Sequence, residues 1–234
     1  MRIVIKLGTS TLAHPTGLLN IKRVEELCKV MSDLKNAGNE IIIVSSGAIG
    51  MGAGKLVLSE KPKDIRTKQA AAAVGQCELM YTYDKLFSEY NHTVAQILIT
   101  GEDIEHAERS RNFENTILRL LELGAIPIIN ENDSVATNEI VIGDNDTLGA
   151  IVAKSIKADL LILLSDIDGL FTADPHKDKN AVLLSEVKEI TPEIEGMTGG
   201  AGSRLGTGGM TTKLNAAKIA TAAGVDMVIA NGKE

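Results

Sequence analysis

The sequence predicts an α/β fold in which a largely parallel sheet is covered by helices on both faces. Short apolar runs typical of strands alternate along the whole chain with segments whose apolar residues recur at helical spacing. This alternation implies right-handed crossovers between parallel strands. Glycine-rich or polar loops follow several of the strand-like runs, and ligands bind at such strand ends in open parallel sheets.

Length and composition favour one domain that spans residues 1–234. With 234 residues, 44% of them hydrophobic, the chain is long enough to bury a sizeable core. A net charge of −7 provides no basic field for nucleic acid, so we expect no nucleic-acid partner. Any phosphate site is therefore expected to be local and to bind a small molecule.

The cysteines and the apolar runs predict a soluble cytoplasmic chain. Cys28 and Cys77 both lie in segments of apolar periodicity and are interpreted as reduced, packed thiols. The first residues lead directly into a strand-like run without a cleavable apolar leader, and no stretch of 18 apolar residues occurs. We expect no membrane partner.

The N-terminal half contains four predicted strands, and Lys6 is the one charge within the first of them. Lys6 either extends from an edge strand to solvent or serves a ligand. A second glycine loop with Ser46 is predicted over residues 45–54. The expected strands cover 3–7, 40–44, 94–99 and 126–129, and the expected helices cover 20–38, 67–90 and the region of 117–121 up to Gly124.

Short polar side chains gather over residues 130–134, directly after the fourth strand. They form either an ordinary turn rich in Asn and Asp or part of a binding site. In the C-terminal half, strands are expected over 140–142, 160–164, 182–184 and 227–230, and helices from 148 and over 192–197.

The segment GTGGMTTKLNAAKIA, residues 206–220, combines a glycine loop with a helix whose first turns carry Lys213. Backbone N–H groups, the positive end of the helix dipole and the side chains of Thr211 and Thr212 all favour a phosphate there. The segment matches neither the P-loop nor the dinucleotide fingerprint. Taken alone, it could equally be a flexible linker before a surface helix.

No metal site built from protein side chains is predicted. Neither the GDND segment at 143–146 nor the segment 166–169 has the spacing of a calcium loop. The four histidines are scattered without ligand spacing, and we expect them at the surface. Mg²⁺ carried by a nucleotide is the expected metal.

Six motifs in this order resemble those of the amino acid kinase family over essentially the whole chain: KLGTS, SSGAIGMG, INENDSV, GDND, LLSDIDGLFTADP and GTGGMTTK. The resemblance implies a three-layer α/β/α sandwich with a mainly parallel central sheet. It also implies phosphorylation of the γ-carboxylate of L-glutamate by ATP, which is the first step of proline biosynthesis. Members often carry a further C-terminal PUA domain, and we expect none in this sequence.

The resemblance also implies residue roles. Lys6 and Lys213 correspond to lysines that flank the transferring phosphoryl group, and Asp146 corresponds to the acid that orients them. The N-terminal part is expected to bind mainly glutamate through Ser46, Gly47, Asp133 and Asn145. The C-terminal part is expected to bind ATP mainly through Ser165, Asp166, Thr207, Gly208, Gly209, Met210, Thr211, Thr212 and Lys213, together with Lys6.

The chemistry agrees with these roles. A carboxylate acceptor is ionised at neutral pH and needs no general base, whereas its approach to a polyanion needs cations around the transferring group. The family further implies a homo-oligomer, a dimer or tetramer, and feedback inhibition by proline. Two alternatives remain open: a family enzyme that phosphorylates acetylglutamate, carbamate or uridylate, and a non-catalytic amino acid sensor on the same fold.

Overall fold

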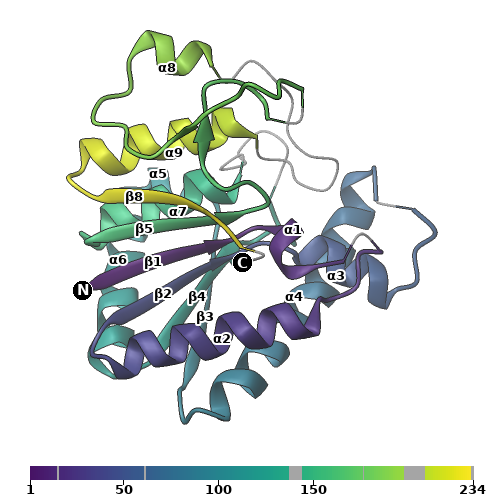
Figure 1. Ribbon diagram of the computed structural model, residues 1–234. Helices are drawn as coiled ribbons and strands as arrows, with labels where there is room; N and C mark the ends of the chain where they lie inside the picture. Colours follow the sequence, from purple (N-terminus) through teal and green to yellow (C-terminus); the bar gives the residue numbers. More distant parts are fainter. Residues whose placement is uncertain (15, 61, 137–143, 176, 198–208, 233–234) are drawn as a thin grey trace.

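A parallel sheet forms the centre of the molecule, and helices cover both of its faces (Figure 1). The computed structural model describes residues 1–234 except 15, 61, 137–143, 176, 198–208 and 233–234. In this described part the central sheet has six strands in the order β3-β4-β2-β1-β5-β8: β1 (Arg2–Leu7), β2 (Glu40–Ser45), β3 (Val94–Ile99), β4 (Ile126–Glu131), β5 (Leu160–Ser165) and β8 (Asp226–Asn231).

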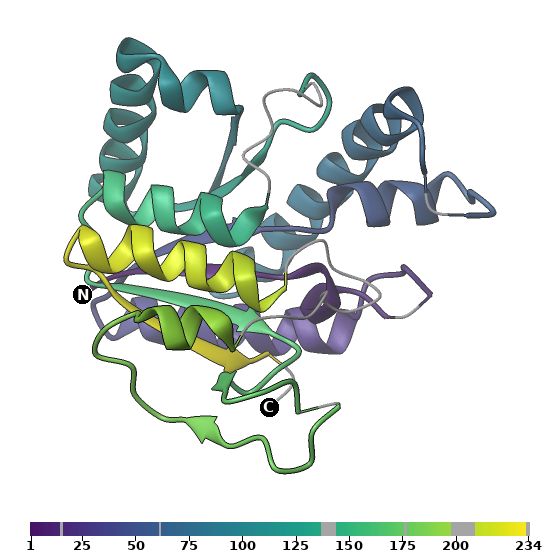
Figure 2. The same cartoon turned by 90° about the horizontal axis from the view of Figure 1, so that it is seen from above.

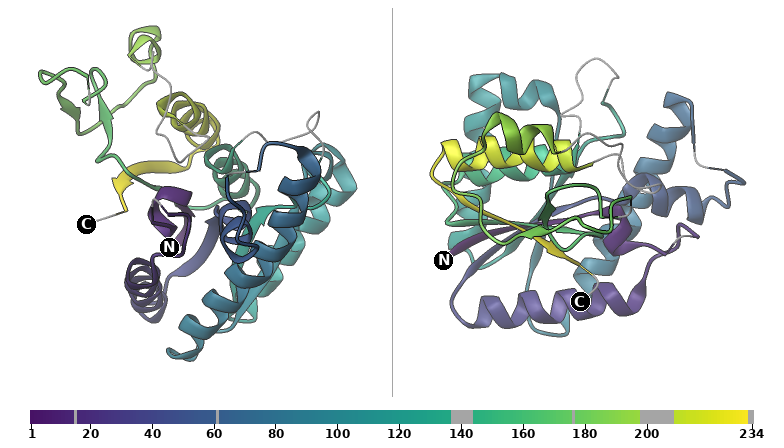
Figure 3. Two further views of the ribbon diagram at one scale, coloured as in Figure 1. Left: turned by 90° about the vertical axis from the view of Figure 1, so that its right-hand side faces the viewer. Right: turned by 45° about the horizontal axis from the view of Figure 1, so that its top comes forward.

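One helical layer covers each face, as Figures 2 and 3 show. The first layer contains α1 (Thr9–Leu12), α2 (Ile21–Asn36), α3 (Ala48–Lys55) and α4 (Ile65–Ser88). The second contains α5 (Gly101–Glu105), α6 (Ala107–Glu122), α7 (Asn145–Ser155) and α9 (Met210–Ala222). The short helix α8 (Pro192–Gly196) is linked to α9 by an ion pair, and β6 (Leu170–Phe171) pairs antiparallel with β7 (Leu183–Leu184).

The strands supply both halves of the core because successive side chains point to opposite faces of a sheet. In β1, Ile3 and Ile5 pack against the α2 and α4 side, while Val4 packs against the α7 side. This double burial confirms the predicted three-layer α/β/α sandwich with its mainly parallel sheet.

The strand order places β1 where the direction of winding reverses. From β1 the chain proceeds outward through β2, and later it returns to add β5 and β8 on the other side of β1. All neighbouring pairs of the central sheet are parallel, so the carboxyl ends of its strands share one edge. Ligands bind at such a reversal point in open α/β sheets.

The second predicted glycine loop is wrong for most of its length, because residues 48–55 form helix α3. Glycine is a poor helix former, and packing against α4 explains its presence. A Cβ atom on Gly52 would lie 1.7 Å from the carbonyl oxygen of Ala71, and one on Gly75 of α4 would lie 1.7 Å from the carbonyl oxygen of Ala48. These glycines let the two helix backbones touch.

The cysteines and histidines agree only in part with what the sequence predicted. Cys28 is buried as predicted, and burial raises its pKa to about 12, but Cys77 is exposed on α4. His14 and His106 are exposed, whereas His92 is half-buried. His176 and the expected strand over 140–142 lie outside the described residues. None of the described helices has the length and apolar character that crossing a bilayer requires.

Candidate active site

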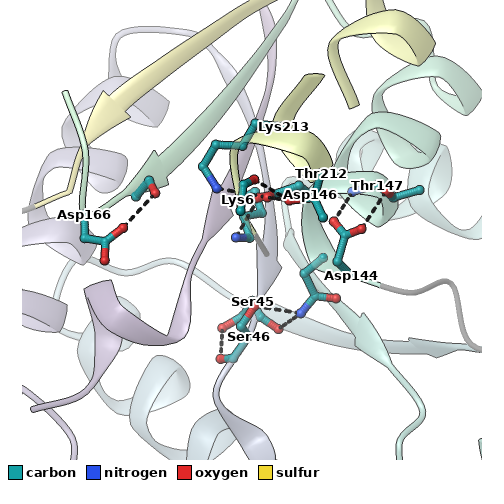
Figure 4. A network of polar contacts seen from close by, with 12 residues as sticks. Lys6, Ser45, Ser46, Asp144, Asp146, Thr147, Asp166, Thr212 and Lys213 are labelled. Carbon is teal, nitrogen blue, oxygen red and sulfur yellow. Dashed lines mark hydrogen bonds and ion pairs between the residues drawn. The ribbon is translucent and has the colours of Figure 1, made fainter. Parts of the chain in front are cut away.

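Two lysines meet one buried carboxylate beside the carboxyl end of β1 (Figure 4). The Nζ atom of Lys6 lies 2.7 Å from Oδ1 of Asp146, and the Nζ atom of Lys213 lies 3.0 Å from Oδ2 of the same side chain. All three residues are at most 8% exposed. Three sequence-predicted residues from distant segments therefore form one ion cluster.

Each member of the cluster is positioned by its own element. Lys6 lies on β1 with its stem against α7; a Cβ atom at Gly149 would lie 3.5 Å from the Cβ of Lys6, an ordinary van der Waals distance. Asp146 lies in the first turn of α7, next to the cap residue Asp144, which accepts a hydrogen bond from the Thr147 backbone N–H. Lys213 lies near the start of α9, which packs on α7.

The electrostatic balance of the cluster keeps Asp146 ionised. Burial alone would raise the pKa of this carboxyl group, but the charges of Lys6 and Lys213 outweigh the burial and lower the pKa of Asp146. Each lysine ammonium has three N–H groups, of which the contact with Asp146 uses one. The remaining donors can bind a further anion.

The start of α9 provides additional donors next to the cluster. Gly209 is the N-cap of this helix and gives it no side-chain cap, so first-turn N–H groups remain for an anion. The hydroxyl group of Thr212 donates to Oδ2 of Asp146 over 2.8 Å. Met210 and Thr211 lie in the same turn, whereas the predicted Thr207 and Gly208 lie outside the described residues.

A network of side-chain amides lies beside the lysine cluster. Asn145 Nδ2 donates to Ser46 Oγ over 2.8 Å and to Asn130 Oδ1 over 3.1 Å, and Asn130 Nδ2 donates to Gln76 Oε1 over 3.1 Å. The structure thus brings the predicted residues Ser46 and Asn145 into contact. Gly47, between β2 and α3, has φ +106°, a left-handed conformation that favours glycine and lets the chain turn beside Ser46.

Asp133 lies apart from these hydrogen bonds, in a pocket of about 390 Å³ between α4, β3 and the turn after β4. It makes no ion pair with any residue that the structure describes. Burial raises the pKa of its carboxyl group. A half-buried carboxylate without a cation is suited to pairing with a cationic group of a ligand.

Ser165 is the last residue of β5, and Asp166 follows it at the same edge of the sheet. The Ser165 hydroxyl donates to Oδ1 of Asp166 over 3.3 Å, and the Ser165 carbonyl accepts from the Gly232 backbone N–H over 2.8 Å. No hydrogen bond or ion pair joins these two side chains to the lysine cluster in the described part of the chain, so their role in ATP binding stays a prediction. Among the described residues, no group of three His, Cys, Asp or Glu side chains could hold a metal ion.

Two members of the amide network were not singled out from the sequence. Asn130 belonged to the polar group at 130–134, where a turn explained it equally well. Gln76 interrupts the buried side of α4 between Ala72 and Leu79, which are at most 2% exposed. A polar residue at helical spacing within an apolar face is the signal that would have identified it.

Comparison with protein families shows that residues 1–231 match the amino acid kinase family. The chain is 58% identical to a glutamate 5-kinase of Clostridium acetobutylicum, with 100% of this chain and 87% of that protein covered. It is 55% identical to a glutamate 5-kinase of Clostridium perfringens, covering 99% and 88%. It is 56% identical to a glutamate 5-kinase of Carboxydothermus hydrogenoformans, with 98% of this chain and 62% of that protein covered.

Solved structures agree with the fold. A Giardia lamblia carbamate kinase bound to AMP-PNP superimposes with a TM-score of 0.69 at 17% identity, covering 99% of this chain and 92% of that one. An isopentenyl phosphate kinase from T. acidophilum gives a TM-score of 0.67 at 16% identity, again covering 99% and 92%. At such identities the likeness concerns the fold alone.

Proposed function

Because the chain belongs to the amino acid kinase family, we propose that it transfers the γ-phosphoryl group of ATP to the γ-carboxylate of L-glutamate, forming L-glutamyl 5-phosphate and ADP in the first step of proline biosynthesis. A carboxylate oxygen of glutamate forms the new bond to phosphorus as the bond to the ADP oxygen breaks. The observation that carries this proposal is the pair of lysines held on one carboxylate.

The reaction needs positive charge more than it needs a base. The acceptor carboxylate is ionised at neutral pH, so no proton has to be removed, but two anionic groups must approach each other. Lys6 and Lys213 provide cations that are already in place, because Asp146 holds both side chains before any ligand arrives. Asp146 itself stays ionised and acts as their positioning residue.

The two substrates approach the cluster from different segments. The nucleotide phosphates occupy the start of α9 from Gly209 to Lys213, and the nucleotide extends toward Ser165 and Asp166. Glutamate occupies the side of Ser46, Gly47 and Asn145, with its α-ammonium on Asp133. Mg²⁺ on the phosphate oxygens of ATP would neutralise further negative charge during transfer.

Acceptor discrimination tests this function against the alternative family reactions. N-acetyl-L-glutamate lacks the α-ammonium group, so Asp133 would face an amide and remain unpaired. We expect a preference for L-glutamate of at least about a hundredfold in kcat/KM, or about 2.7 kcal/mol. Hydroxylamine trapping of the acyl phosphate measures it for each acceptor, with carbamate and UMP assayed by ADP release.

Equal trapping of the two acceptors, or a preference for the acetylated compound, would contradict the assignment to glutamate. An absence of turnover with every acceptor would instead favour the non-catalytic sensor. Both lysines of the catalytic pair are present and held in place, which supports an enzyme over a sensor.

We also propose how the enzyme assembles, how it is regulated and where it is located. The enzyme is a dimer or tetramer in the cytoplasm and is inhibited by proline. Light scattering during gel filtration measures the assembly, and a proline titration of initial rates measures the inhibition. A monomer, or rates that proline leaves unchanged, would contradict these parts without affecting the reaction.

A further inference from the structure

Gln76 of α4 has a buried hydrogen-bond donor without a partner. The residue is 8% exposed, and its Oε1 atom accepts from Asn130 Nδ2 over 3.1 Å. Its Nε2 group has no hydrogen-bond partner among the described residues. Buried polar groups are nearly always paired in native proteins, so this donor is expected to bind a ligand or a water.

The side chain that carries this unpaired donor lines the pocket that contains Asp133. Gln76 and Asp133 line the same pocket of about 390 Å³, Gln76 from α4 and Asp133 from the turn after β4. One wall therefore contains the neutral Gln76 amide and another contains the Asp133 carboxylate. The α-carbon of an amino acid carries the complementary pair, a carboxylate that accepts and an ammonium that donates.

A chain of side-chain amides connects this donor to the lysine cluster. Asn130 bridges Gln76 and Asn145, and Asn145 directly precedes Asp146 at the start of α7. Because Asn130 Oδ1 accepts from Asn145, Asn130 Nδ2 faces Gln76. The Oε1 atom of Gln76 must therefore face Asn130, and Nε2 is directed away from Asn130. The network thus fixes the Gln76 amide beside the pocket and holds it relative to Lys6 and Lys213.

We propose that Gln76 Nε2 donates a hydrogen bond to the α-carboxylate of the acceptor amino acid, next to the ammonium bound by Asp133. This inference rests on the proposed function and makes Gln76 a residue that selects α-amino acids with a free α-carboxylate. The γ-carboxylate of the same molecule then extends toward the lysine cluster.

The decisive variant is Gln76→Glu, which keeps an oxygen acceptor for Asn130 and replaces the donor with a second oxygen. Gln76→Met removes the donor without adding charge. The two variants share only the loss of the donor. Gln69→Glu on the same helix is the matched control: it makes the same chemical change at a residue that donates to the Ala136 carbonyl and does not line the pocket.

The measurement compares L-glutamate with its α-amide, which lacks the α-carboxylate charge but keeps the γ-carboxylate. For both Gln76 variants we expect kcat/KM for glutamate to fall at least about tenfold, mainly through KM, with the KM for ATP nearly unchanged. The preference for glutamate over its α-amide should fall most in Gln76→Glu, whose carboxylate can accept from the amide. Gln69→Glu should match the wild type.

A binding measurement provides a second readout without turnover. L-glutamate alone should raise the Tm of the wild-type protein and of Gln69→Glu, and this shift should be lost in both Gln76 variants. The Tm without ligand shows whether each variant is folded.

An unchanged KM for glutamate in Gln76→Glu would overturn the inference and leave a bound water as the partner of Nε2. Equal losses for glutamate and its α-amide would also overturn it. If the wild-type protein itself neither binds nor phosphorylates glutamate, the proposed function fails instead, so the two failures are distinguishable.

Discussion

Lys213 and Asp146 are 67 positions apart in the sequence, yet their side chains form a buried ion pair with 3.0 Å between Nζ and Oδ2. The pair joins the starts of two helices, α9 and α7, that pack against each other. Both helix starts also carry the positive end of a dipole. The carboxylate of Asp146 therefore helps to hold the ammonium groups of Lys6 and Lys213 close to the N-terminal ends of α7 and α9.

Removing Lys213 should abolish most turnover and leave the protein folded. We expect Lys213→Ala to lower kcat at least about a hundredfold, or 2.7 kcal/mol, because a cation at the transferring group is lost. Asp146 keeps Lys6 as a partner, which limits the cost in stability. Initial rates and Tm are the measurements, and Lys6→Ala should behave similarly.

Lys218→Ala is the matched control for Lys213, since Lys218 lies on the same helix and forms an exposed ion pair with Glu195 of α8. Such a surface pair contributes little. A turnover number for Lys213→Ala equal to that of Lys218→Ala would remove Lys213 from the catalytic machinery.

Asp146→Asn should reduce both stability and turnover, because two buried lysines lose their shared anion. Leaving a buried charge without its partner costs about 3 kcal/mol or more. The pKa of Asp146 is lowered in the folded protein, so its stabilising contribution is present above the ordinary aspartate range and is lost as the pH falls through the lowered pKa.

Unfolding of the Asp146→Asn variant by denaturant, followed from neutral to acid pH, measures this contribution. The difference in free energy of unfolding between wild type and variant should shrink toward acid. A difference that is constant with pH would contradict an ionised Asp146 as the anchor of the lysines.

Asp133→Asn should raise the KM for L-glutamate far more than the KM for ATP, because the α-ammonium loses its anionic partner. Burial raises the pKa of Asp133. Glutamate binding therefore weakens as the pH falls through this raised pKa, and the dependence should disappear in the variant. Steady-state kinetics across pH check both statements.

The same raised pKa gives an opposite effect on stability. Ionised Asp133 is disfavoured in the folded state without ligand, so its stability cost appears as the pH rises through the raised pKa. Asp133→Asn is expected to raise Tm at neutral pH in the absence of glutamate. A higher KM for ATP with normal glutamate kinetics would instead place Asp133 on the nucleotide side.

Gly52→Ala should destabilise the contact between α3 and α4. The added Cβ would lie 1.7 Å from the carbonyl oxygen of Ala71, so the helices must separate, at a cost of about 1–3 kcal/mol. Gly50→Ala in the same helix is the control, because its added Cβ would lie 3.9 Å from Thr9 Cγ2, an ordinary van der Waals distance. A Gly52→Ala variant as stable as Gly50→Ala would contradict close helix packing.

The order of helices and strands could be predicted because its signals are local. The Asn20 side chain caps α2 by accepting from the Arg23 N–H, and Gly38 and Gly124 follow their helices with φ +90° and +78°. Short apolar runs predicted the strands of the central sheet within one or two residues. Placement of the motifs at strand ends followed from the same periodicity.

The glycines at 50, 52 and 54 show where local signals were insufficient. Their composition is typical of a loop, whereas residues 48–55 form a helix in which Gly52 lies directly against the backbone of α4. Similarly, the sequence could not distinguish a Cys77 packed in the core from one exposed on α4. Helix periodicity gives the spacing of a face, but the neighbouring elements decide which positions are covered.

The sequence by itself determined the order of the central strands and of the long helices, the parallel sheet and the chemical types available at its carboxyl edge. The tertiary structure alone decided that Lys6 and Lys213 share one carboxylate and that Gln76 carries an unpaired donor beside Asp133. The physical reason is range: backbone periodicity and capping act within a few residues, whereas a buried ion pair depends on how β1, α7 and α9 pack across the sheet.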